Sequence, residues 1–100
     1  MIYMIDVTIN YNLITGDIQK HLEAEWKVSD ELYASGRMLR IWRKANAKGA
    51  IAIWDMPDHN AVSDQIRKMP LYPFFGDVRV TPLVAHPRFP QFCEADKNRG

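Results

Sequence analysis

Residues 38–54 read MLRIWRKANAKGAIAIW, and this stretch decides the fold of the chain. Its two halves, residues 38–45 and 49–54, are rich in the β-branched and aromatic side chains that favour strands. The segment Asn46-Ala47-Lys48-Gly49 between them has the asparagine and glycine that are typical of tight turns. The stretch therefore predicts a β-hairpin with strands at residues 38–45 and 49–54.

The segment before the hairpin predicts one strand and one helix. Residues 2–9 alternate with the two-residue period of a strand. From Asp17 onward the period becomes helical, with Thr15 or Asp17 as the cap, and Gly36 supplies the stop. The first half of the chain is therefore expected to run strand, long helix, strand.

The segment after the hairpin repeats this pattern in a shorter form. A helix opens at Pro57-Asp58 and ends at Pro70, and residues 77–83 alternate again as a strand. The complete order β-α-β-β-α-β predicts an α+β, ferredoxin-like domain, in which two helices cover one face of an antiparallel four-stranded sheet. We expect this domain to span residues 1–87, with a C-terminal arm or tail over residues 88–100.

Composition excludes several classes of function. The net charge is +1 and the basic residues are scattered, so no footprint for nucleic acid is present. No apolar stretch approaches the roughly 20 residues of a membrane span, and the N-terminus has no secretory pattern. The single Cys93 forms no intrachain disulfide. We expect a cytoplasmic protein.

The sheet is expected to bury its second face against another copy of the chain. Ile, Trp and Met occur on both faces of several expected strands, and a chain of 100 residues hides only part of its apolar surface alone. Trp26, Trp42 and Trp54 are interpreted as core or subunit contacts. The chain is thus predicted to form a homo-oligomer, built from dimers that close into an α+β barrel.

Glu25 breaks the apolar pattern of the long helix. At about 100° per residue, it lies near the middle of one arc, with Ser29 beside it. That arc, expected to face the sheet, contains Ile18, Leu22, Trp26, Val28, Leu32 and Tyr33. Burial raises the pKa of a carboxyl group, toward what a general base needs at neutral pH. The alternative is a structural role, in which Glu25 pairs with Arg43, Arg40 or Lys48.

Two further residues are candidates for binding a ligand. Arg43 is placed to clamp a carboxylate through two parallel hydrogen bonds, or serves as a surface arginine. His86 lies in a loop after the last strand, where a histidine is most often a surface residue. The histidines His21, His59 and His86 show no metal-ligand spacing, and no glycine-rich phosphate loop is present. We expect no metal and no cofactor.

Four motifs carry a resemblance to a known family. They are Ile41-Trp42-Arg43, Ile53-Trp54-Asp55-Met56-Pro57, the segment Met-Pro-Leu-Tyr-Pro-Phe at residues 69–74, and His86-Pro87. At nearly the same spacings, they resemble Leu-Trp-Arg, Val-Phe-Asp-Val-Pro, Leu-Pro-Leu-Phe-Pro-Tyr and His-Pro of muconolactone isomerase and the related chloromuconolactone dehalogenases. The resemblance extends over most of the chain.

This resemblance implies a cofactor-free 1,3-proton shift in an unsaturated lactone, a step of aromatic catabolism in the β-ketoadipate pathway. Glu25 matches the family's helix glutamate and is assigned as acid and base. Arg43 and Lys48 are assigned as anion binders, and Ser29 and His86 as polar groups that line the site. The resemblance also implies dimers assembled into larger rings, a decamer among them, in which neighbouring subunits complete each site.

The chain departs from the family pattern at three positions. Lys48 and Ala50 stand where typical members carry Tyr and Asn, and Leu39 stands where they carry an arginine that Arg37 or Arg40 can replace. Two alternatives therefore stay open beside the isomerase. One is dehalogenation or another elimination on a related lactone, and the other is a non-catalytic small-molecule-binding domain on the same scaffold.

Overall fold

The central hairpin forms as the sequence predicts. The structure, a computed structural model, describes residues 1–93. Strand β2 (Met38–Arg43) pairs antiparallel with β3 (Gly49–Asp55), and Arg43 lies opposite Ala50. The strand ends two residues before the predicted residue 45, because the amide of Ala47 donates to the carbonyl oxygen of Lys44 (2.9 Å) and so begins the turn there.

The hairpin extends into a four-stranded antiparallel sheet. Strand β1 (Ile2–Ile9) pairs with β3 on one side and with β4 (Phe75–Leu83) on the other, in the order β2-β3-β1-β4. Strand β4 begins two residues earlier than predicted. This topology is the ferredoxin-like arrangement expected from the element order.

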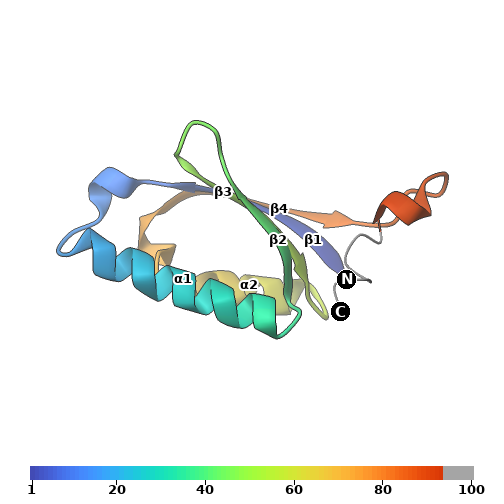
Figure 1. The fold of residues 1–100 in the computed structure, drawn as a ribbon, viewed down its shortest axis with the longest axis horizontal. Coiled ribbons are helices and arrows are strands. Elements are labelled where there is room, and N and C mark those ends of the chain that lie inside the picture. The colour runs from blue at the N-terminus through green and yellow to red at the C-terminus, as the bar shows by residue number, and fades with distance from the viewer. Residues whose placement is uncertain (94–100) are drawn as a thin grey trace.

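Both helices lie on the same face of the sheet (Figure 1). Helix α1 (Ile18–Ala34) is capped by Asp17, whose carboxylate accepts from the amides of Gln19 and Lys20. Helix α2 (His59–Lys68) is capped in the same way by Asp58. Three short 3-10 turns complete the described elements: η1 (Tyr11–Leu13), η2 (Tyr72–Phe74) and η3 (Pro90–Cys93). The opposite face of the sheet carries no layer within residues 1–93 (Figure 1).

The core lies between the sheet and the helices. The alternation of β1 and β3 sends Tyr3, Ile5, Ala52 and Trp54 to the helix side, where all four are buried. Helix α2 packs on this layer through buried Val62 and Ile66, among other residues. The sheet and α2 therefore supply most of the buried core.

Helix α1 is rotated relative to the prediction. Ile18, Trp26 and Tyr33 were expected to face the sheet, yet they are 44%, 52% and 47% exposed, and Leu32 is the buried residue of this helix. The face turned inward carries Glu25, Val28 and Leu32, which the same prediction placed there. The prediction for Ile18, Trp26 and Tyr33 was wrong because two neighbouring arcs of α1 are both partly apolar, and the helical period alone does not choose between them.

The three tryptophans differ in how far their side chains are buried. Trp54 is a core residue with 4% of its surface exposed, whereas Trp26 on α1 and Trp42 on β2 lie on the surface of the protomer.

After β4 the chain leaves the domain as an arm (Figure 1). Of the predicted tail, residues 94–100 lie outside the described part. Within residues 1–93, the helices are too short or too polar to cross a bilayer.

Candidate functional site

The side chain of Glu25 points from α1 toward the segment after α2. Its Oε1 accepts a hydrogen bond of 2.9 Å from the backbone amide of Leu71. Leu71 is the N-cap of η2, is itself 2% exposed, and is therefore fixed by packing. The contact spans 46 residues of sequence and fixes the carboxylate on the inner side of the helix.

Burial controls the acidity of this carboxylate. Removal from water raises the pKa of Glu25 above its ordinary value of 4.5, and the hydrogen bond from Leu71 opposes this rise in part. The described part of the chain gives Glu25 no ion-pair partner. The structural alternative, a buried pair with Arg43, Arg40 or Lys48, is therefore absent from the described residues.

A narrow cavity lies beside Glu25, between α1 and the sheet. Its volume is about 50 Å³, which accommodates a few water molecules. Ser29, one helical turn after Glu25, also lines it. The remaining lining side chains are apolar: Ile5, Val7, Ile9, Leu32, Met38, Ile41, Ala50, Ala52, Trp54, Ile66, Met69 and Phe75. The cavity is therefore a narrow apolar slot, and Glu25 is the acidic residue that lines it.

Arg43 stands at one end of this slot. It is exposed, and it lies opposite Ala50, a lining residue, in the register of β2 and β3. Residues directly opposite each other on antiparallel strands project to the same face, so the Arg43 side chain leaves the sheet on the cavity side. Arg43 does not line the cavity itself. Its exposed guanidinium is available to an anion near this end of the sheet.

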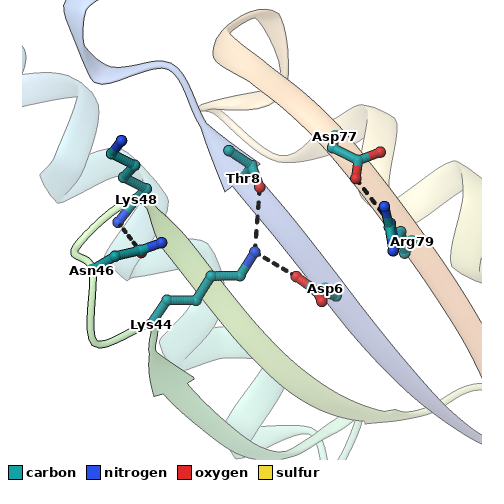
Figure 2. Close-up of polar contacts among 7 residues, drawn as sticks. All are labelled: Asp6, Thr8, Lys44, Asn46, Lys48, Asp77 and Arg79. Atoms are coloured by element: carbon teal, nitrogen blue, oxygen red, sulfur yellow. Dashed lines mark hydrogen bonds and ion pairs between the residues drawn. The ribbon is translucent and has the colours of Figure 1, made fainter.

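Lys48 lies in the turn that follows, near the same end of the sheet. It is exposed, and its backbone amide donates to Oδ1 of Asn46 (2.9 Å). Figure 2 shows its side chain directed away from a neighbouring polar cluster, in which Lys44 Nζ lies 2.6 Å from Asp6 Oδ1 and 3.2 Å from Thr8 Oγ1. That cluster occupies the uncovered face of the sheet, because Asp6 and Thr8 alternate with the inward-facing Ile5 and Val7. Lys44 is therefore committed to β1, whereas Lys48 forms no side-chain bond among residues 1–93.

His86 lies apart from the other candidates. It follows β4 in the arm, where its ring packs on Phe89 (5.1 Å between centroids) and its Nδ1 accepts from the amide of Arg88 (3.1 Å). It does not line the Glu25 cavity of its own protomer. The structure therefore brings Glu25 and Ser29 together, places Arg43 and Lys48 near one end of the site, and leaves His86 outside.

Sequence reasoning missed two groups of the site. One is the backbone amide of Leu71, which no side-chain pattern reports. The other is Trp54, whose alternation with Ala50 and Ala52 puts it on the cavity face of β3. The two-residue period of the strand predicts that Trp54 shares a face with Ala50 and Ala52. Its indole, however, is expected from the sequence only as a core or subunit contact.

A second, open hollow of about 520 Å³ lies between α2 and β4. Its polar side chains include His59, Ser63 and Arg67, and no carboxylate lines it. Arg67 is held on its own helix, through bonds to Ser63 and Asp64. The described residues contain no cluster of three or more His, Cys, Asp or Glu that is suited to a metal ion. Of the two hollows, the Glu25 cavity is therefore the one that places a carboxylate among apolar side chains.

Fold and site together define a class: a ferredoxin-like α+β protein in which a partly buried carboxylate with a raised pKa lines an apolar slot, an arrangement that suits acid–base chemistry. Residues 1–88 match the model of the family described as muconolactone delta-isomerase. The chain belongs to the muconolactone delta-isomerase family. The prediction of an enzyme of this isomerase family, with a ferredoxin-like fold, is confirmed.

One sequence relative and two solved structures are similar to this chain. The muconolactone delta-isomerase of Pseudomonas aeruginosa is 29% identical over 69 residues, which are 68% of this chain and 71% of that protein. A crystal structure of muconolactone isomerase superposes with a TM-score of 0.74 at 23% identity, over 87% of this chain and 92% of the other. The 5-chloro-2-hydroxyhydroquinone dehydrochlorinase TftG of Burkholderia phenoliruptrix, in complex with 2,5-dihydroxybenzoquinone, shares the fold with a TM-score of 0.65. It is 12% identical, over 88% of this chain and 98% of that one.

Proposed function

We propose that this protein is a cofactor-independent isomerase that moves a proton by a 1,3-allylic shift within an unsaturated lactone such as muconolactone. One observation carries the proposal: the Glu25 carboxylate is partly desolvated, has no ion-pair partner among residues 1–93, and is anchored through one oxygen by Leu71. Its other oxygen is left for a substrate. The family and its Pseudomonas relative supply the substrate class.

The reaction needs one group that both accepts and returns a proton. Ionised Glu25 removes the acidic proton next to the lactone double bond, and the electron pair of the broken C–H bond spreads over a dienolate. The glutamic acid formed returns the proton to the far end of the allylic system. No atom is gained or lost. The raised pKa of Glu25 favours both halves, because it brings the acidity of the carboxyl closer to neutral pH.

The two ends of the slot differ in charge and polarity, and this difference matches the carboxylate end and the lactone end of such a substrate. Arg43 and Lys48 supply positive charge near the mouth for a carboxylate, and the apolar side chains inside exclude water from the dienolate. Ser29 lies on the same wall as Glu25 and provides a hydroxyl to the substrate. His86, remote in its own protomer, is assigned to the site of a neighbouring subunit.

The assembly that this assignment needs is a homo-oligomer of dimers, up to a decamer. The uncovered sheet face and the exposed Trp26 and Trp42 support it, because exposed aromatic surface of this kind is typical of subunit contacts. We place the enzyme in the cytoplasm, in aromatic catabolism.

Deuterium incorporation tests the function. Wild-type protein and Glu25→Gln are incubated with muconolactone in D2O and followed by proton NMR. Exchange by the wild type and not by the variant supports the isomerase. Chloride release from a chlorinated muconolactone, without isomerisation of the parent lactone, identifies the dehalogenase instead. Lactone binding without either reaction identifies a binding protein and overturns the proposal.

A further inference from the structure

The indole of Trp54 carries a buried hydrogen-bond donor that the protein does not use. Only 4% of the residue is exposed, and its Nε1 is the buried side-chain atom of the described residues that lacks a hydrogen-bond partner. Buried donors are normally paired, because leaving one unmet costs free energy, and an exception in a native fold calls for an explanation.

The position of Trp54 supplies that explanation. It lines the same slot as Glu25, on the strand face that also carries Ala50 and Ala52. In the register of the sheet it lies opposite Met38, whereas Ala50 lies opposite Arg43. At roughly 3.3 Å per residue, these two rungs are about 13 Å apart. Trp54 therefore lies at the end of the slot remote from Arg43, which stands beyond Ala50, and Glu25 lies on the wall of that slot.

The side chains around Trp54 indicate which kind of ligand group its indole N–H can bind. Leu32, Met38 and Ala52 line this end of the slot, and they bring neither charge nor a second donor. A carboxylate needs several donors or a cation when it is buried, whereas a neutral carbonyl oxygen is satisfied by one N–H. The inner end of the slot therefore fits a lactone carbonyl, and the outer end, near Arg43, fits the carboxylate.

We propose that the Trp54 indole N–H donates a hydrogen bond to the lactone carbonyl at the inner end of the cavity and so sets the direction in which the substrate enters. This inference rests on the proposed function. As the proton leaves carbon, negative charge develops on that carbonyl oxygen, and a donor already in place stabilises it. The donor belongs to this chain in particular, because the Val-Phe-Asp-Val-Pro motif that residues 53–57 resemble has phenylalanine at this position.

The slot must widen to admit a lactone, since its volume is about 50 Å³. Met38 and Met69 line it, and their unbranched side chains adapt readily to a new neighbour. Binding therefore moves methionine side chains and opens the indole nitrogen to the ligand. The unmet donor of the ligand-free protein becomes a paired donor in the complex.

The test observes the donor directly. The chain has three tryptophans, so a ¹⁵N-labelled sample shows three indole N–H signals, and Trp54→Phe assigns the one that disappears. Muconolactone is titrated into the wild type, in which the signal of Trp42, assigned with Trp42→Phe, serves as the reference because Trp42 does not line the slot. We expect the Trp54 signal to shift downfield and the Trp42 signal to stay. We also expect Trp54→Phe to lower kcat/KM by about 10²- to 10³-fold.

Each outcome bears on the inference. A lactone that binds the wild type without moving the Trp54 signal overturns it, and so does a folded Trp54→Phe protein with wild-type kcat/KM. The signal is measured in the wild type, so the titration decides the question even where the variant folds poorly. A shifted Trp54 signal without deuterium exchange preserves the binding role and overturns the isomerase. A lactone that does not bind overturns both.

Discussion

The amide of Leu71 and the carboxylate of Glu25 lie 2.9 Å apart, although 46 residues separate them in the chain. This bond ties α1 to the segment that follows α2, and it occupies one oxygen of the carboxylate. A single backbone donor thus anchors Glu25 beside the slot without neutralising its charge.

Replacement of Glu25 by glutamine is expected to abolish proton transfer and to preserve the fold. Glutamine keeps an oxygen for the Leu71 amide but has no basic oxygen, so kcat should fall by about 10²- to 10⁴-fold. Deuterium exchange measures this loss. Glu23→Gln, an exposed change two residues away on the same helix, is the control and should retain wild-type exchange. Equal losses in both variants contradict the assignment.

The raised pKa of Glu25 gives activity and stability opposite dependences on pH. The folded protein holds this proton more tightly than the unfolded chain does. The free energy of unfolding therefore falls as pH rises from the ordinary value of 4.5 through the raised folded pKa, whereas kcat/KM rises over the same interval. Urea unfolding and initial rates at a series of pH values measure both. In Glu25→Gln this component of the stability profile should vanish, and its persistence argues against Glu25 as the source.

Arg43→Met is expected to raise KM for an anionic lactone by about tenfold, because a hydrogen bond to a charged group contributes about 1.5–3 kcal/mol. The change keeps the apolar stem and removes the guanidinium at the mouth of the slot. Steady-state kinetics separate KM from kcat, which should change less. Lys27→Met removes the same charge from an exposed position on α1 and serves as the control. A tenfold rise in both variants would indicate a general effect of charge instead of a contact.

Gly49→Ala should destabilise the protein more than Gly36→Ala does. Both glycines have positive φ, 153° at Gly49 and 79° at Gly36, but a Cβ at Gly49 would overlap the carbonyl oxygen of Val7, whereas a Cβ at Gly36 meets nothing within 4 Å. We expect a cost of about 1–2 kcal/mol for Gly36→Ala and a larger one for Gly49→Ala. Denaturant unfolding compares them. Similar midpoints contradict the close approach of β3 to β1.

The strands were predictable because their period is short and their sequence is clear. The alternation over residues 2–9 matches the bounds of β1 without error, and the Asn46–Gly49 turn placed the hairpin. The order of the elements, β-α-β-β-α-β, is typical of one common topology, the ferredoxin-like fold. Small differences at strand ends, as at Arg43 and Phe75, come from hydrogen bonds of turns, which the alternation of side chains does not report.

The site was predictable only in part. Glu25 was identified because a charge inside an apolar stripe conflicts with burial, and the structure places it against the cavity as expected. The direction of Trp26 was not predictable, since rotation of α1 depends on contacts with Leu71 and β2 that are remote in sequence. The assignments of Glu25 to acid–base catalysis and of Arg43, Lys48, Ser29 and His86 to substrate binding stay predictions. The arm that carries His86 leaves the domain altogether (Figure 1).

Helix α1 holds the sheet chiefly through its last turns, because Leu32 is its buried side chain. Its first turns rest on lighter contacts, such as the edge of the His21 ring against Phe74. Segments with little buried apolar surface open at a lower free-energy cost than the core does. The first turns of α1 should therefore separate from the sheet at a lower free-energy cost than its last turns, and we expect a ligand to enter beneath them while every strand keeps its partners.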